Sequence, residues 1–168
     1  MREPKILRLR GLGFLLATAT LALDQLSKWL ILNVIMKPPF FIELTPVLNL
    51  VLGYNRGVSF GMLRSDSEIG RWLLSALAIL IICALTIWLL RVDKIRLSIA
   101  LGLIIGGAIG NVTDRIMIGA VVDFIDLHLG GFHWPAFNVA DMAITIGAAI
   151  LILDTIFDYK SDGKTDGR

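Results

Sequence analysis

Residues 72–90 read WLLSALAILIICALTIWLL, an uninterrupted stretch without a charged side chain. A bilayer core about 30 Å thick is crossed by about 20 apolar helical residues, so this stretch predicts a transmembrane helix. Three more stretches, 11–35, 97–118 and 138–157, meet the same requirement. The 168-residue chain is 56% hydrophobic and only 18% charged, so lipid must cover apolar surface that one small core cannot bury. We expect an α-helical integral membrane protein in which residues 1–168 form a single membrane domain of four transmembrane helices.

The segment 37–64 differs from the four predicted spans. Its prolines break any helix, and β-favouring residues with glycine and asparagine turn signals accompany them. We therefore expect a small extracytoplasmic β-sheet, a cradle that lies on the membrane surface.

Basic residues predict the orientation of the chain. Lys and Arg gather before the first span, in the link 91–96 and in the C-terminal tail, whereas the link 119–137 has none. The positive-inside rule then places both termini in the cytoplasm. A cleaved signal peptide is the alternative for the first span, because Ala17-Thr18-Ala19 resembles a cleavage site. The apolar pattern, however, continues well past that tripeptide.

Two features of the composition exclude other classes. The formal net charge of +2 is too small to suggest a nucleic-acid partner. Cys83 is the single cysteine, so an intrachain disulfide is excluded. It stands within an apolar span with no base nearby in the sequence, and we expect it to fill space rather than to react.

Ionisable residues inside a bilayer cost several kcal/mol unless they are paired or wetted, so each is a functional candidate. Helical rise places four of them in the outer half of three different spans: Asp24, Lys28, Asp114 and Asp141. Structural roles are the alternative. Asp24 and Lys28 are spaced i,i+4 and can neutralise each other, and Arg115 can neutralise the adjacent Asp114.

Two asparagines accompany these charges. Asn138 and Asp141 fit the pattern of a helix N-terminus, where the asparagine caps the helix and the dipole favours the carboxylate. Asn111 lies i,i+4 from Arg115 and shares its helix face. This second cluster is compatible with a purely structural network.

The link 119–137 offers no cation to Asp123, Asp126 or Asp141. The two aspartates of the link could simply be solvated. Alternatively, two or more unneutralised carboxylates crowd one site beside a low-dielectric phase. One pKa then rises, and the pair holds one proton and acts as acid and base together. That arrangement hydrolyses peptide bonds in aspartic proteases. Asp141, favoured in its ionised form by the helix N-terminus, is the better base candidate.

Other chemistries receive less support. The sequence contains neither HExxH nor GxSxG. Asp126, His128 and His133 make only a loose metal-ligand spacing. We therefore expect no metal site.

Many of the polar residues stand in five ordered blocks: Asp24-Gln25-Leu26-Ser27-Lys28; Asn55-Arg56-Gly57 with Phe60-Gly61; Gly110-Asn111-Val112-Thr113-Asp114-Arg115; Val122-Asp123-Phe124-Ile125-Asp126; and Phe137-Asn138-Val139-Ala140-Asp141. These blocks resemble the motifs of the lipoprotein signal peptidases (signal peptidase II) over about residues 24–141. One block would be a weak signal, but five in order are highly specific. The departures, Thr113 and Met142, touch no charged position.

The resemblance implies an aspartyl endopeptidase of the bacterial inner membrane, with four helices and a periplasmic β-cradle. It implies that Asp123 and Asp141 are the catalytic pair and that no cofactor is needed. The remaining matched residues would bind substrate or support the pair (Asn55, Asn111, Arg115, Asn138 and Asp114) or be structural (Asp24 and Lys28). The role of Asp126 stays open.

The resemblance also implies the substrate. Prolipoproteins whose lipobox cysteine carries diacylglyceryl would be cut immediately before that cysteine, close to the periplasmic face. Lipid anchoring agrees with this, because each buried CH₂ contributes about 0.8 kcal/mol to membrane binding. We expect contact with membrane lipid, no nucleic acid, and a monomeric enzyme.

Two other functions remain alternatives. Intramembrane Asp and Lys also form the relays of ion- or proton-coupled transporters, although those place ionisable groups through the full depth and often show repeated halves. A non-catalytic assembly factor could use the glycines spaced every four residues, Gly102, Gly106 and Gly110, to grip a partner helix. Packing within the protein is the simpler role for these glycines.

Overall fold

The computed structural model describes residues 3–38, 40–57 and 68–162. In this part of the chain, four helices are long and apolar enough to cross a membrane. They are α1 (Glu3–Leu30), α2 (Glu68–Leu89), α3 (Ile95–Met117) and α4 (Val139–Asp162), and α1 continues into a π-helical turn, η1 (Ile31–Ile35). The predicted four-helix membrane fold is confirmed.

The fold also contains an antiparallel sheet, in which the strands are arranged in the order β1-β2-β3-β4. Its strands are β1 (Phe41–Thr45), β2 (Leu48–Asn55), β3 (Val121–Leu129) and β4 (Phe132–His133). The sheet was predicted, but only β1 and β2 lie within the segment 37–64. Residues 58–64 of that segment, with the motif residues Phe60 and Gly61, lie outside the described residues.

The sequence predicts a loop over residues 119–137, and β3 corrects that prediction. Its first four residues are all buried, so it lacks the alternation of a half-exposed strand. A short apolar run of this kind cannot be assigned by periodicity alone. Pairing with β2 along nearly the full length of that strand provides the missing information.

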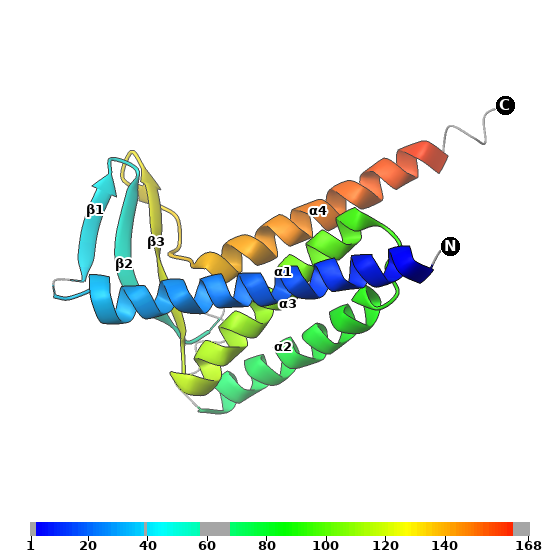
Figure 1. Ribbon diagram of the computed structural model, residues 1–168. Helices are drawn as coiled ribbons and strands as arrows, with labels where there is room; N and C mark the ends of the chain where they lie inside the picture. Colours follow the sequence, from blue (N-terminus) through cyan, green and yellow to red (C-terminus); the bar gives the residue numbers. More distant parts are fainter. Residues whose placement is uncertain (1–2, 39, 58–67, 163–168) are drawn as a thin grey trace.

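The sheet lies at one end of the helical bundle, and α1 begins and α4 ends at the other end (Figure 1). Helix α3 is central and packs against α1, α2 and α4. In the apolar stretch that could cross the membrane, 56% of α3 is buried inside the protein, compared with 11% of α2. Helix α2 therefore leaves most of its surface for lipid, whereas α3 carries side chains into the interior.

Close packing of α3 depends on its glycines. A methyl group at Gly106 would meet the carbonyl oxygen of Ala17 on α1, and one at Gly107 would meet that of Ala140 on α4. Small residues allow such approach between membrane helices, where no hydrophobic effect drives association. The contact at Gly106 supports the packing role inferred for the glycine pattern, and Gly107, outside that pattern, adds a close approach to α4.

We predict that Gly106→Ala lowers the thermal midpoint of the detergent-solubilised protein. Overpacking against a helix backbone costs about 1–3 kcal/mol. Gly11→Ala is the matched control on α1, because a methyl group there meets nothing within 4 Å. Equal midpoints for the two variants, measured by intrinsic fluorescence, would show that the α1–α3 contact tolerates the extra carbon.

Candidate active site

The site is built around a buried cation, Lys28. Its Nζ lies 2.8 Å from a carboxylate oxygen of Asp24 and 2.8 Å from one of Asp114, and it donates to Oδ1 of Asn111 at 3.3 Å. The three charged residues have relative exposures of 2% or less. The predicted pairing of Asp24 with Lys28 is confirmed.

The predicted partner of Asp114 is corrected. Its salt bridge runs to Lys28 on α1 rather than to the adjacent Arg115. Neighbouring residues on a helix do not face each other, so Asp114 points toward α1. Arg115 instead donates from Nη1 to the carbonyl oxygen of Asn111 at 3.4 Å.

The ion cluster also binds two backbone groups of other elements. Oδ1 of Asp24 accepts from the backbone N–H of Ala140 on α4 at 2.9 Å. Oδ2 of Asp114 accepts from that of Val122 on β3 at 3.1 Å. Gln25 bridges the carboxylates, donating at 3.2 Å to Asp24 and at 2.9 Å to Asp114. The sequence did not predict this role for Gln25, although the residue stands in the first motif block.

These two backbone contacts have a consequence for the candidate pair. Ala140 immediately precedes Asp141, and Val122 immediately precedes Asp123. The buried ions therefore hold the chain one residue before each aspartate. Asp24 and Lys28 thus lie behind the candidate pair and do not contact its carboxylates in the hydrogen bonds described above.

Asn138 contacts both candidate aspartates. Its Nδ2 donates to Oδ1 of Asp123 at 2.7 Å, and its backbone N–H donates to Oδ2 of Asp141 at 3.3 Å. Its Oδ1 accepts from the backbone N–H of Asp141 at 3.0 Å. The last two bonds form a reciprocal cap at the start of α4. Asn138 thus caps the helix, as predicted, and also contacts the other carboxylate.

The remaining carboxylate oxygens are held by two further amides. Asn55 on β2 donates to Oδ2 of Asp123 at 3.1 Å. Asn111 on α3 donates to Oδ1 of Asp141 at 2.9 Å. Arg115 interacts electrostatically with both aspartates. Three asparagines and one arginine, all predicted site residues, therefore surround the pair.

The two aspartates differ in environment. Burial raises the pKa of Asp123 to about 6, and the nearby charge of Asp141 adds to the rise, while hydrogen bonds from Asn55 and Asn138 oppose it. Asp141 lies in the first turn of α4, where the helix dipole favours a negative charge. Burial thus favours the protonated form of Asp123.

Asp126 does not join this group. Successive side chains of a strand point to opposite faces, so Asp123 and Asp126, three residues apart on β3, face opposite sides. Asp126 accepts from Asn49 at 2.8 Å and is hydrogen-bonded to His133. The hydrogen bond with His133 is the main cause that lowers the pKa of Asp126, and the bond from Asn49 lowers it further. The alternative that both aspartates are solvated loop residues is wrong, because their exposures are 4% and 5%.

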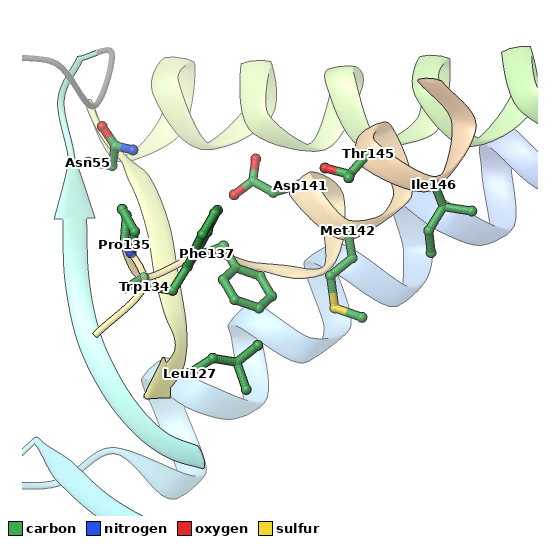
Figure 2. A pocket seen from close by; sticks show the side chains of 10 residues that line it. Asn55, Leu127, Trp134, Pro135, Phe137, Asp141, Met142, Thr145 and Ile146 are labelled. Carbon is green, nitrogen blue, oxygen red and sulfur yellow. The ribbon is translucent and has the colours of Figure 1, made fainter. Parts of the chain in front are cut away.

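A cavity of about 650 Å³ opens beside Asp141. Figure 2 shows Trp134, Pro135, Phe137 and Leu127 on one side and α4 on the other. Its lining is mostly apolar: Asn55, Leu127, Trp134, Pro135, Ala136, Phe137, Asp141, Met142, Thr145 and Ile146. In the described part of the chain, no group of three or more His, Cys, Asp or Glu residues could hold a metal ion.

Comparison with known proteins decides the family. The family model for signal peptidase (SPase) II matches residues 16–157. The chain belongs to the lipoprotein signal peptidase family, signal peptidase II. The predicted family and activity, an aspartic signal peptidase in a multi-pass membrane protein, are thereby confirmed, and the transporter and assembly-factor alternatives are set aside.

Curated signal peptidase II relatives cover most of this chain. A lipoprotein signal peptidase of Methylorubrum extorquens (strain PA1) is 45% identical over 157 residues, 92% of this chain and 91% of the relative. One of Burkholderia vietnamiensis (strain G4 / LMG 22486) is 51% identical over 137 residues, 79% of this chain and 80% of the relative.

A solved structure shares the fold of this signal peptidase II. It is described as a bacterial membrane enzyme determined by the in meso method at 2.3 Å resolution. The TM-score is 0.79 at 31% identity, and the match covers 90% of this chain and 91% of that chain.

We predict that Lys28→Met strongly destabilises this signal peptidase. Removing one partner of a buried ion pair costs about 3–5 kcal/mol because a charge is left uncompensated. Lys94→Met is the control, since Lys94 is about half exposed and its ion pair with Asp154 is longer, at 3.8 Å. Thermal unfolding in detergent measures both. Adding Asp114→Asn to Lys28→Met should recover part of the loss, and no recovery would contradict a charge-based cause.

Proposed function

We propose that Asp123 and Asp141 are the catalytic pair with which this chain cleaves the signal peptide of prolipoproteins. The observation that carries the proposal is the position of Asn138, which hydrogen-bonds both carboxylates beside an apolar cavity that Asp141 lines. An amide is uncharged and both donates and accepts. It can therefore hold two carboxylates together while they exchange protons with substrate.

The pair divides the chemistry by its environment. Ionised Asp141 accepts a proton from water, and the water oxygen attacks the carbonyl carbon of the scissile peptide bond. Protonated Asp123 donates its proton to the carbonyl oxygen as the tetrahedral intermediate forms. When the C–N bond breaks, the proton held by Asp141 passes to the leaving amine. The proton on the carbonyl oxygen then returns to Asp123, leaving a carboxylic acid and an amine.

Neighbouring polar residues position the substrate in this proposal. Asn55 and Asn111 each use Nδ2 on one aspartate, and both stand beside the reacting centre. Arg115 adds positive charge near both carboxylates, where it would stabilise negative charge developing on the peptide. Asp114 supports the pair through Lys28 and Val122.

The substrate is proposed to be a precursor whose cysteine carries diacylglyceryl, cut just before that cysteine. Two acyl chains give stable membrane anchoring, which would keep the scissile bond near the bilayer surface. The cavity extends from Asp141 along the apolar residues Met142 and Ile146 of α4, in keeping with a lipid-anchored ligand. We propose further that the enzyme acts as a monomer in contact with bilayer lipid.

The proposed orientation follows from charge. Arg91, Lys94 and Arg96 lie in or beside the link between α2 and α3, at the end of the bundle away from the sheet. The positive-inside rule then places this end and both termini in the cytoplasm. The sheet and the aspartates would lie near the periplasmic face of the bacterial inner membrane.

We predict that Asp123→Asn and Asp141→Asn each abolish cleavage of a purified lipidated precursor, with the variants still folded. An amide can neither take up the proton nor supply it. Asp126→Asn is the matched control on the same strand and should keep most of the kcat. A gel-shift assay with precursor bearing or lacking diacylglyceryl measures all three. Full activity in Asp123→Asn or Asp141→Asn would contradict the assignment of the catalytic pair. Equal cleavage of the two precursors would contradict the requirement for diacylglyceryl.

We predict that Asn55→Ala moves the alkaline limb of the kcat/KM profile to higher pH. The Asn55 hydrogen bond stabilises ionised Asp123 and lowers its pKa. Without it, the pKa rises above about 6, and the protonated form persists to higher pH, by roughly half to one pH unit. Asn49→Ala, on the same strand but bonded to Asp126, should leave the limb in place. A limb that moves to lower pH would contradict the assignment.

A further inference from the structure

One side of the substrate cavity is a short connecting segment. Residues 134–137, which we call the strap, join β4 to α4, and all four line the cavity. Figure 2 shows Trp134, Pro135 and Phe137 of the strap on one side and Met142 of α4 on the other. The position of the strap therefore determines the width of the cavity beside Asp141.

The strap is fastened to β3 at both ends by backbone hydrogen bonds. At its start, the N–H of Trp134 donates to the carbonyl oxygen of Leu127 at 2.8 Å. At its end, Phe137 exchanges two bonds with Ile125, at 2.9 and 3.0 Å. Its last residue is followed by Asn138, which holds the two aspartates. The Trp134 end is held by one of these bonds and the Phe137 end by two. A shift of the strap would therefore change the cavity first at its Trp134 end.

A side-chain cluster reinforces that end from behind. Nδ1 of His133 lies 2.9 Å from each carboxylate oxygen of Asp126, and Nδ2 of Asn49 donates to Oδ2 of Asp126 at 2.8 Å. A carboxylate only accepts hydrogen bonds, so Nδ1 of His133 carries the proton. We call these three residues, Asn49, Asp126 and His133, the clasp.

The Asp126–His133 pair of the clasp and the cavity lie on opposite faces of the β3–β4 hairpin. Side chains alternate along a strand, so Asp126 and Leu127 of β3 point to opposite faces. Leu127 and Trp134 line the cavity, whereas no clasp residue does. The clasp therefore acts on the cavity only through the backbone of β3 and β4.

The strength of the clasp comes from its charge and burial. Asp126 has a relative exposure of 5%, and both its oxygens are engaged. Hydrogen bonds to an ionised acceptor are roughly twice as strong as neutral ones. The half-exposed His133 is therefore held against the sheet, and the residue after it is Trp134.

We propose that His133 is a positioning residue for the substrate cavity, acting through its hydrogen bond to Asp126. This inference rests on the proposed function, because it assigns substrate to the cavity beside Asp141. In this proposal His133 affects the affinity for substrate and does not contact the reacting atoms. It also gives Asp126 a role distinct from that of Asp123.

The test is His133→Phe, assayed at a fixed detergent concentration with the lipidated precursor. Phenylalanine keeps a ring against His128, whose ring centroid lies 4.9 Å away, but has no donor for Asp126. We expect KM to rise about tenfold, the effect of losing one charge-assisted hydrogen bond, with kcat within about twofold. His133→Asn should restore a KM near that of wild type, since the amide nitrogen takes the place of Nδ1.

His128→Phe is the matched control. It keeps the ring pair and leaves the bonds between Asp126 and His133 in place, so KM should match that of wild type. A fall in kcat with unchanged KM in His133→Phe would overturn the proposal, as would failure of His133→Asn to restore KM. A similar KM rise in His128→Phe would assign the effect to ring packing and would also overturn it.

The outcomes separate this inference from the proposed function. If Asp123→Asn still cleaves the precursor, the catalytic pair fails whatever His133 does. If the pair variants are inactive and His133→Phe has a wild-type KM, only the clasp fails. Thermal midpoints of all variants show whether a change in KM accompanies loss of the fold, and a KM rise matched by unfolding at the assay temperature counts against positioning.

Discussion

The end of this protein that carries the sheet depends on one buried ammonium group, that of Lys28. Moving such a charge out of water costs several kcal/mol, and two carboxylates at 2.8 Å offset that cost. One carboxylate comes from α1 and the other from α3, and each also accepts a backbone N–H, from α4 and β3. A single ion cluster thereby fixes four elements at one point. The candidate catalytic residues follow directly after two of the bonded residues, so the cluster stabilises the fold and aligns the site together.

The proposed pair gains its asymmetry from the elements that carry it. Asp123 is buried on a strand, and burial raises its pKa to about 6. Asp141 stands at a helix N-terminus, where the dipole favours the charged form. Asn138 joins the two without adding charge, so neither carboxylate is locked into one protonation state. Two carboxylates with separate environments are what acid–base hydrolysis needs.

Strand β3 connects the chemistry with the cavity. One face carries Asp123 toward Asn55 and Asn138, and Leu127 on the same face lines the cavity. The reverse face carries Asp126 toward Asn49 and His133. The period of two along a strand thus separates two aspartates that are only three residues apart, one proposed for the reaction and one for positioning. A helix would have placed both on one side.

The sequence alone determined the class of the protein and predicted most residues of its candidate site. Long apolar stretches specify membrane helices because backbone groups in lipid must bond within their own segment, and Asp24 with Lys28 is a pair along one helix. Three features could not be predicted from the sequence: strand β3, the salt bridge from Lys28 to Asp114, and the separation of Asp126 from Asp123. Each depends on contacts between residues far apart in the chain, such as Asn49 with Asp126, that local periodicity does not encode. Only the tertiary structure decided them, because strand register and helix packing set which distant polar groups meet inside the protein.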